Sequence, residues 1–175
     1  MAHVERNDPY QKRGISAPQA QRYLFAAKML DKFNTVADLG CGYGYGVKIL
    51  TDNGFDIIGM DYSDDAIDTA YDRYGGRYIK VDLNDLSLRG FKNAVCLETL
   101  CHLQNPAVFL DLTSVEQLVV SAPIDPDPND GYIYRKHNYS EKEFLNLFKD
   151  KWQIIEELRQ TYGVTYLTLF ARRKK

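Results

Sequence analysis

The sequence of 175 residues predicts an α/β protein with a doubly wound, mostly parallel sheet. Short apolar runs alternate with segments whose apolar residues recur at helical spacing. A glycine-rich turn follows the first run, and four runs end at or beside an acid: Asp38, Asp61, Asp82 and Glu98. Because ligands of such sheets bind beyond the carboxyl ends of the strands, these acids also mark the expected site.

The first half of the chain supplies a leading helix and three strands. Ser63 is an N-cap residue, and Gly54 and Gly75 are stops of the kind that end helices. Phe33 closes the apolar stripe of the leading helix. We expect a helix at 18–33, a strand at 35–39, a helix that Gly54 ends, a strand at 57–60, a helix from Ser63 to Gly75, and a strand at 78–81.

The second half completes the sheet. Ser140 and Glu143 form a capping box ahead of a helix. Alternating apolar and polar residues around Tyr162 and Gly163 predict an antiparallel hairpin at the end of the chain. We expect strands at 94–98 and 116–121, a helix from 105 to 110, a long loop at 123–138, and hairpin strands at 152–158 and 164–171.

The turn at 38–46 reads Asp-Leu-Gly-Cys-Gly-Tyr-Gly-Tyr-Gly. Gly40, Gly42 and Gly44 let the backbone turn tightly and approach a ligand, since no Cβ is in the way. A dinucleotide fingerprint needs a third glycine three residues after the second, and neither frame has one. The carboxylate of Asp38 would repel a pyrophosphate but suits an amino group. The turn therefore predicts a cofactor that carries a cation.

Residues 38–46 resemble motif I of the class I S-adenosylmethionine (SAM) methyltransferases, and the similarity extends over nearly the whole chain. Asp61 follows Gly40 by 21 residues, the spacing of a ribose-binding acid in a doubly wound nucleotide site. The resemblance implies a Rossmann-like sheet of seven strands in the order 3-2-1-4-5-7-6. It also implies one domain over 1–175, in which we expect residues 1–17 to be a flexible lid.

The resemblance implies SAM as the cofactor and distributes its contacts along the strand ends. Asp38 would hold the methionine part, Asp61 the ribose, and Asp82 with Leu83 the adenine. Tyr62 is either a stacking partner of the adenine or an ordinary half-buried tyrosine, and the acids alone can also be read as helix caps. The expected cofactor-binding residues are Asp38, Gly40, Cys41, Gly42, Gly44, Asp61, Tyr62, Asp82, Leu83 and Leu97.

Glu98 and His102 are the expected catalytic residues. Methyl transfer from a sulfonium needs alignment above all, together with removal of one proton if the acceptor is a hydroxyl. His102 titrates near neutrality and suits that task, although a structural histidine bonded to backbone remains an equal alternative. Glu98, Cys101, His102 and His137 also resemble the metal site of plant-type small-RNA 2′-O-methyltransferases. Cys101 replaces its second glutamate, and a thiol does not suit magnesium, so we expect no metal.

The flanking segments 22–27, 121–123 and 137–144 resemble methyltransferase domains found with polysaccharide-synthesis genes, a group similar to small-molecule and sugar O-methyltransferases of the ubiquinone-biosynthesis type. This implies a small-molecule or saccharide hydroxyl as the acceptor. Its rim would include the polar and aromatic residues Tyr10, Tyr132, Tyr134 and Arg135. Two alternatives stay open, a SAM-binding partner subunit without activity and a SAM-degrading enzyme, whereas the missing third glycine argues against a nicotinamide oxidoreductase.

The composition sets the remaining expectations. A formal net charge of -2 and a pI near 5.9 argue against a nucleic-acid partner. Three cysteines, an odd number, are simplest as reduced thiols. No apolar stretch is long enough to span a membrane, and the N-terminus lacks a signal-peptide core. We therefore expect a soluble cytoplasmic protein, and a homodimer is compatible with the sequence.

Overall fold

The computed structural model describes residues 17–175 apart from 86–89, 113 and 133. The expected lid at 1–17 and the rim residue Tyr10 therefore lie outside the described residues, except for Ala17, which begins the first helix. In chain order the elements are α1 (Ala17–Met29), β1 (Val36–Leu39), α2 (Tyr45–Asp52), β2 (Ile57–Asp61), α3 (Asp64–Tyr74), β3 (Tyr78–Lys80), β4 (Asn93–Leu97), the 3-10 turn η1 (Leu100–His102), α4 (Pro106–Leu112), β5 (Gln117–Ile124), α5 (Glu141–Asn146), β6 (Trp152–Tyr162) and β7 (Val164–Arg173).

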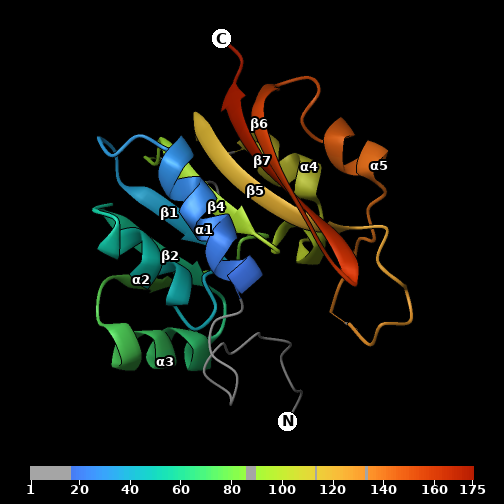
Figure 1. The fold of residues 1–175 in the computed structure, drawn as a ribbon. Helices are drawn as coiled ribbons and strands as arrows, with labels where there is room; N and C mark the ends of the chain where they lie inside the picture. The colour runs from blue at the N-terminus through green and yellow to red at the C-terminus, as the bar shows by residue number, and fades with distance from the viewer. Residues whose placement is uncertain (1–16, 86–89, 113, 133) are drawn as a thin grey trace.

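A single seven-stranded sheet has the order β3-β2-β1-β4-β5-β7-β6, as the resemblance implied (Figure 1). The strands from β3 to β5 pair in parallel, and β7 runs antiparallel to both β5 and β6. Every residue of β1 and β4 is buried, which is typical of central parallel strands covered on both faces. The predicted fold class is therefore confirmed.

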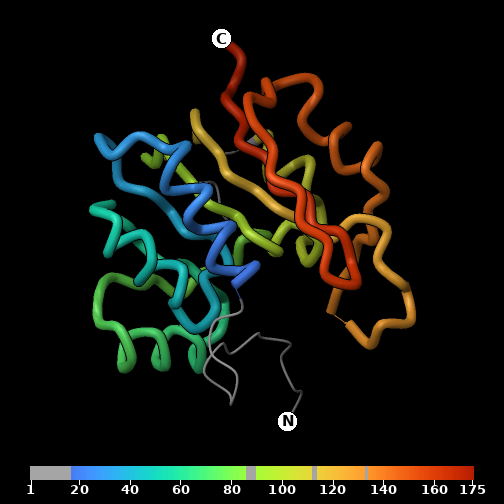
Figure 2. The backbone as a smooth tube through the Cα atoms, in the orientation of Figure 1, coloured from blue at the N-terminus to red at the C-terminus, as the bar shows by residue number. Residues whose placement is uncertain are grey.

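Helices cover both faces of this sheet (Figures 1 and 2). Val36 of β1 belongs to a core cluster with Tyr23 of α1 and Leu50 of α2. The next residue, Ala37, points to the opposite face and belongs to a cluster with Phe144 of α5. Successive residues of a strand point to opposite faces, so β1 contributes to both cores. The first helices thus form one layer and the last two helices form the other.

The C-terminal hairpin forms one end of the sheet. A long loop, residues 125–138, connects β5 to α5. The tube in Figure 2 shows β6 and β7 lying side by side and the loop 125–138 projecting beyond the sheet. The backbone N–H groups of Lys136 and His137 both donate to the carbonyl of Cys101, at 2.9 and 3.1 Å. This loop is therefore tied to the segment that follows β4.

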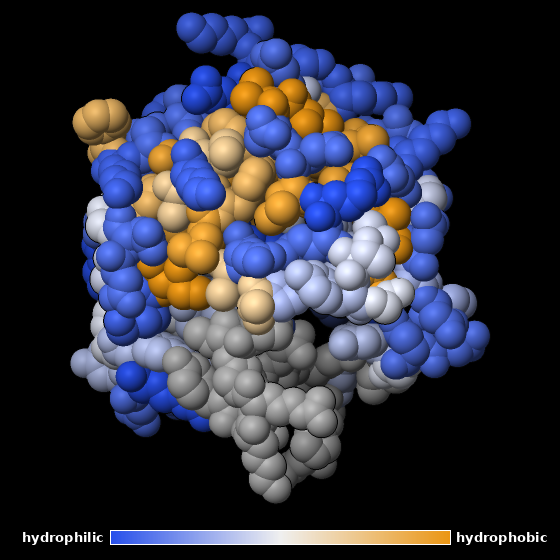
Figure 3. Space-filling model, in the orientation of Figure 1, coloured by the Kyte–Doolittle hydropathy of each residue, from blue (hydrophilic) through white to orange (hydrophobic). Residues whose placement is uncertain are grey.

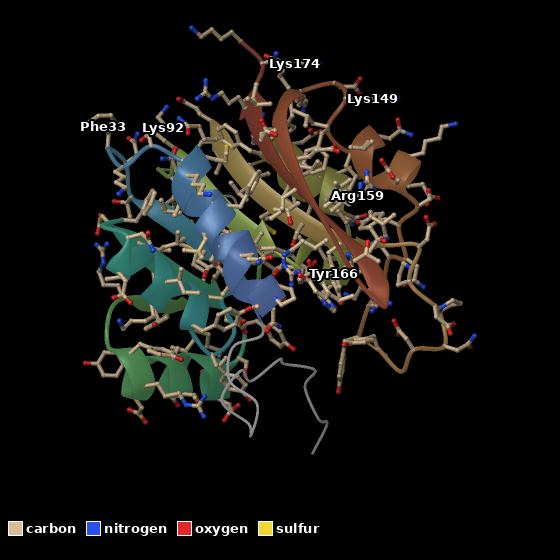
Figure 4. The ribbon with its side chains drawn as sticks, viewed as in Figure 1. Phe33, Lys92, Lys149, Arg159, Tyr166 and Lys174 are labelled. Atoms are coloured by element: carbon tan, nitrogen blue, oxygen red, sulfur yellow. The ribbon has the colours of Figure 1, made fainter. Side chains whose placement is uncertain are left out.

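Three predicted boundaries differ from the structure by three residues or more. The leading helix ends at Met29, because the Asp31 carboxylate accepts the Phe33 backbone N–H at 3.1 Å and forms a turn that competes with the helix. Phe33 is 96% exposed and projects from the body in Figure 4. Strand β5 continues to Ile124, since β7 pairs with it as far as Thr165, so the loop starts two residues later than expected. In the hairpin, β6 likewise extends to Tyr162.

The turn η1 was not expected from the sequence. It places His102 on a short 3-10 segment directly after β4. Within the described part of the chain, no helix is both long enough and apolar enough to cross a bilayer.

Candidate active site

Carboxylates line the edge of the sheet where its parallel strands end. Asp38 lies in β1, Asp61 ends β2, and Glu98 follows β4 directly. These strands are adjacent in the order β2-β1-β4, and the chain crosses from one side of β1 to the other between β3 and β4. Such a reversal of strand order is where doubly wound sheets bind ligands.

The three glycines of the turn after β1 differ in the space beside them, and one of them borders an open region. Gly40, Gly42 and Gly44 all have positive φ, at 77°, 53° and 81°. A Cβ on Gly40 would lie 2.2 Å from Oγ1 of Thr99, and one on Gly44 would lie 2.6 Å from Cβ of Ala70. Among the residues that the structure describes, a Cβ on Gly42 would meet no atom within 4 Å. Gly40 and Gly44 therefore admit neighbouring elements, whereas Gly42 borders the space in which a ligand can lie.

Asp38 is fully buried beneath this turn, and burial raises the pKa of its carboxyl group to about 7. The Tyr23 hydroxyl of α1 donates to both carboxylate oxygens, at 3.2 and 3.3 Å. Burial also raises the pKa of Tyr23, so this hydroxyl keeps its proton and remains a donor. Gly46 makes room for the Tyr23 ring, because a Cβ there would lie 1.9 Å from its Cζ.

Asp61 closes the turn from the β2 side. Its Oδ2 accepts the Gly42 backbone N–H at 3.0 Å, and its Oδ1 accepts the Ser63 backbone N–H at 3.1 Å. The residue is 6% exposed. Tyr62, the next residue, is 58% exposed. Asp61 is thus fixed by two backbone donors, one of which belongs to Gly42, the glycine that borders the open space.

Asp82 and Leu83 lie beyond the end of β3. The Asp82 carboxylate accepts the backbone and side-chain N–H groups of Asn84, both at 2.8 Å, and the residue is exposed. Leu83 is 6% exposed and belongs to the core. Asp82 thus continues the row of strand-end acids past Asp61, whereas Leu83 packs into the core.

Glu98 stands just after Leu97, which is 8% exposed and ends β4. It has a φ of 58°, a strained backbone conformation for a glutamate. The backbone N–H donates to the Ser121 carbonyl and hydroxyl at 3.2 and 3.1 Å, and the same hydroxyl donates to Oε1 of Glu98. Burial raises the pKa of Glu98, while Arg22 and the Ser121 hydrogen bond pull it down. The side chain nevertheless keeps 29% of its surface exposed.

His102 lies at the end of η1, four residues after Glu98. Its Nδ1 lies 3.1 Å from the Tyr134 carbonyl, and because a carbonyl only accepts, Nδ1 carries the hydrogen. In neutral His102 the other ring nitrogen, Nε2, then carries the lone pair. Burial lowers the pKa of His102, so the imidazole is neutral at pH 7. His102 can therefore be hydrogen-bonded to the backbone through Nδ1 and still accept a proton at Nε2.

The other histidine of the suspected metal set is committed elsewhere. Nε2 of His137 lies 2.9 Å from the Leu103 carbonyl, and the His137 ring stacks on Tyr139. Among the residues that the structure describes, no group of three or more His, Cys, Asp or Glu side chains is arranged to hold a metal ion.

Aromatic rings and paired arginines surround the Glu98 side of the site. Arg135 donates to Asp130 at 2.9 Å and lies 4.7 Å from the centre of the Tyr132 ring. Arg22 of α1 lies 4.7 Å from the centre of the Tyr166 ring, and its Nε is 4.0 Å from Oε1 of Glu98. The predicted rim residues Tyr132 and Arg135 thus meet in one loop.

Sequence reasoning missed Arg22, Tyr23, Ser121 and Tyr166 as site residues. Arg22 could have been found from the sequence, because it lies on the same helical face as Tyr23 and Ala26. That face is buried, and burial of a charged side chain without a partner costs free energy. Ser121 is a polar residue inside an otherwise apolar strand. Nothing local distinguishes Tyr166 from other residues of the hairpin, since only the strand order β5-β7-β6 brings it to the site.

Comparison with known proteins supports a methyltransferase domain. Residues 37–113, from β1 through α4, match the family model described as a methyltransferase domain. No curated protein matches the chain. The match covers less than half of the chain and agrees with the predicted methyltransferase over that part.

Solved structures share the fold at low sequence identity. The small RNA methyltransferase HEN1 has a TM-score of 0.72 and 18% identity, over 99% of this chain and 27% of that chain. The [4+2]-cyclase SpnF has a TM-score of 0.71 and 15% identity, over 88% and 81%. Magnesium protoporphyrin IX methyltransferase from Synechocystis PCC 6803, with bound S-adenosylhomocysteine (SAH), has a TM-score of 0.70 and 18% identity, over 89% and 83%. These similarities establish the class I methyltransferase fold.

Proposed function

We propose that this protein transfers the methyl group of SAM to a hydroxyl oxygen of a small molecule or sugar. The methyltransferase domain match over residues 37–113 and the class I fold support SAM as the cofactor. One arrangement carries the proposal: the buried Asp38 carboxylate lies below a glycine turn whose open position, Gly42, is held by Asp61. In this arrangement Asp38 can pair with a cation, and Asp61 can accept hydrogen bonds from hydroxyl groups.

The chain offers one group for each part of the cofactor. Asp38 is the counter-charge for the ammonium of the methionine part, since an ionised buried carboxylate needs a cationic partner. Asp61 accepts from the ribose hydroxyls while its other bonds to the backbone keep it in place. Tyr62 stacks on the adenine, and Asp82 accepts from the adenine amino group. Leu83 and Leu97 supply apolar walls.

SAM, when bound, supplies an electrophilic methyl group on a sulfonium. The protein then has to align the acceptor, keep it in position and take its proton. We assign proton removal to Nε2 of His102, because the hydrogen bond from Nδ1 to the Tyr134 carbonyl fixes the tautomer in which Nε2 is basic. Glu98, which is partly exposed beside this region, orients the acceptor hydroxyl by accepting a hydrogen bond from it.

The charges around the acceptor side favour an uncharged acceptor. Arg135 is paired with Asp130, and their side chains are only 7% and 18% exposed. Arg22 is shared between Glu98 and Gln160. Neither guanidinium is therefore left to hold an anionic substrate, whereas tyrosine rings can pack against a sugar or another ring.

A homodimer also remains a proposal. Strand β6 is the edge of the sheet and exposes Ile154 and Ile155, and Leu24 of α1 is 43% exposed. Figure 3 shows apolar surface over α1 and the strands beside it. Light scattering after size-exclusion chromatography tests this: a mass of two chains is expected, and a mass of one chain contradicts it.

Transfer of labelled methyl from SAM tests the function. Incubation with panels of nucleotide sugars, glycan termini and small phenols is expected to label at least one hydroxyl acceptor. His102→Ala is expected to lower kcat by about 10²- to 10⁴-fold and to leave SAH affinity unchanged. His137→Ala, the matched control, should spare kcat because its ring bonds to the Leu103 carbonyl. Equal turnover in His102→Ala would return His102 to a structural role.

A further inference from the structure

Arg22 is a charged side chain on the buried face of α1. The residue is 4% exposed, and its guanidinium lies over the Tyr166 ring of β7. Figure 4 shows Tyr166 beside the first turns of α1, where this helix meets the hairpin. A buried guanidinium is costly unless its charge and its hydrogen bonds are matched, so its partners indicate why it is there.

Two side chains, Gln160 and Glu98, contact the Arg22 guanidinium. Its Nη1 donates to Oε1 of Gln160 at 3.1 Å, and its Nε lies 4.0 Å from Oε1 of Glu98. Gln160 is 6% exposed and is itself fixed, because its Nε2 donates to the Pro18 carbonyl at 3.3 Å and to Oε1 of Gln21 at 2.8 Å. A buried chain of contacts thus runs from the edge strand β6 through α1 to the end of β4.

We propose that Arg22 is a positioning residue for Glu98, whose carboxylate it holds turned toward Ser121 at the acceptor side of the site. Gln160 sets the position of the guanidinium, and the guanidinium in turn sets that of the carboxylate. Partners of this kind are needed because the Glu98 backbone is strained, with a φ of 58°. The inference rests on the proposed function, in which Glu98 orients the acceptor.

Charge balance gives Arg22 its effect on Glu98. Burial raises the pKa of Glu98, and the Arg22 charge opposes this rise most strongly. Removing that charge lets the carboxyl group keep its proton to higher pH, in which form it no longer accepts through both oxygens. Within the described ranges, the charged or titratable groups that interact electrostatically with Glu98 are Arg22 of α1, Tyr45 of α2, Cys96 of β4, Arg135 of the loop 125–138 and Tyr166 of β7.

An NMR titration of carbon-13-labelled glutamate carboxyls tests the inference without knowledge of the acceptor, with Glu98→Gln identifying the Glu98 signal. In Arg22→Gln the titration midpoint of Glu98 is expected to move up by about 1 pH unit or more. Arg159→Gln is the matched control, since Arg159 (labelled in Figure 4) is exposed and pairs with Glu141. That control should leave the midpoint unchanged.

A second variant covers the case in which Arg22→Gln does not fold. Gln160→Leu keeps the charge of Arg22 but removes its anchor, and a smaller upward movement of the Glu98 midpoint is expected. An unchanged midpoint in a folded Arg22→Gln, or in Gln160→Leu if only that variant folds, overturns the inference.

SAH titration of the same variants separates this inference from the proposed function. We expect Arg22→Gln to bind SAH within about threefold of the unaltered protein. A large loss of SAH affinity with an unmoved Glu98 midpoint would instead assign Arg22 to the cofactor and overturn its positioning role. Failure of the unaltered protein to bind SAH would contradict the proposed function, whatever the Glu98 midpoint does.

Discussion

The Tyr23 hydroxyl of α1 donates to both carboxylate oxygens of Asp38 in β1, at 3.2 and 3.3 Å, and both side chains are buried. This contact joins the first helix to the central strand at the base of the glycine turn. Burial raises the pKa of Asp38 to about 7, so its charge changes within the neutral range. Cofactor binding should consequently depend on pH.

We predict that SAH affinity rises with pH up to about 7 and is constant above it. In the proposed function the SAH ammonium pairs with the ionised carboxylate, and because the pKa of Asp38 is about 7, a protonated Asp38 must first lose its proton. Affinity should fall by about tenfold for each pH unit below 7. Isothermal titration calorimetry across pH 5.5 to 8.5 measures this, and a flat profile would contradict the assigned partner of the ammonium.

Asp38→Asn is predicted to stabilise the protein without ligand at pH 8. The pKa of Asp38 is raised to about 7 in the folded state and is about 3.9 in the unfolded chain. Between these values the folded state binds the extra proton, so the free energy of unfolding falls as pH rises from about 4 to 7. The stability difference between variant and unaltered protein, from urea denaturation, should therefore grow over this window. A difference that does not change with pH would show that Asp38 titrates normally.

Asp61→Ala should weaken SAH binding by about 1 to 3 kcal/mol, because the ribose hydroxyls lose a charged acceptor. Asp64→Ala is the control, since Asp64 lies three residues later and forms an exposed ion pair with Lys80. Calorimetry on both variants measures the effect. If Asp61→Ala binds SAH as tightly as the control does, the ribose site is assigned to the wrong strand end.

Alanine at two glycines of the turn region should separate folding from binding. Gly46→Ala forces a Cβ into the Tyr23 ring and should cost about 1 to 3 kcal/mol of stability. The Cβ of Gly42→Ala has no atom of the described residues within 4 Å, so the positive φ is what opposes the substitution, at about 1 to 2 kcal/mol. Its methyl group enters the open space and should lower SAH affinity. Thermal melts with and without SAH measure both, and unchanged affinity in Gly42→Ala would move the cofactor away from this turn.

The sequence carried enough signal for the fold because local patterns agree with the global arrangement. The capping box at Ser140 and Glu143 is present, with the Ser140 hydroxyl accepting the Glu143 N–H at 3.3 Å. The boundaries that failed depend on tertiary contacts: β5 extends to Ile124 because β7 pairs with it there. The turn at Asp31, which ends α1 early, depends on a side-chain hydrogen bond that periodicity does not register.

The site was only partly predictable. The strand-end acids Asp38, Asp61 and Glu98 lie along one edge, since parallel strands bring their ends together. The partners that control them come from distant segments: Arg22 precedes Glu98 by 76 residues, and Gln160 lies 138 residues after Arg22. No spacing rule links such positions, because the packing of α1 against the hairpin alone creates the contact.

The most direct test of the central claim is a calorimetric titration of the purified protein with SAH at pH 8. We predict one site per chain with a micromolar Kd, lost or strongly weakened in Asp61→Ala and retained in Asp64→Ala. Absence of binding by both SAH and SAM in the folded protein would contradict the assignment of the strand-end carboxylates to this cofactor.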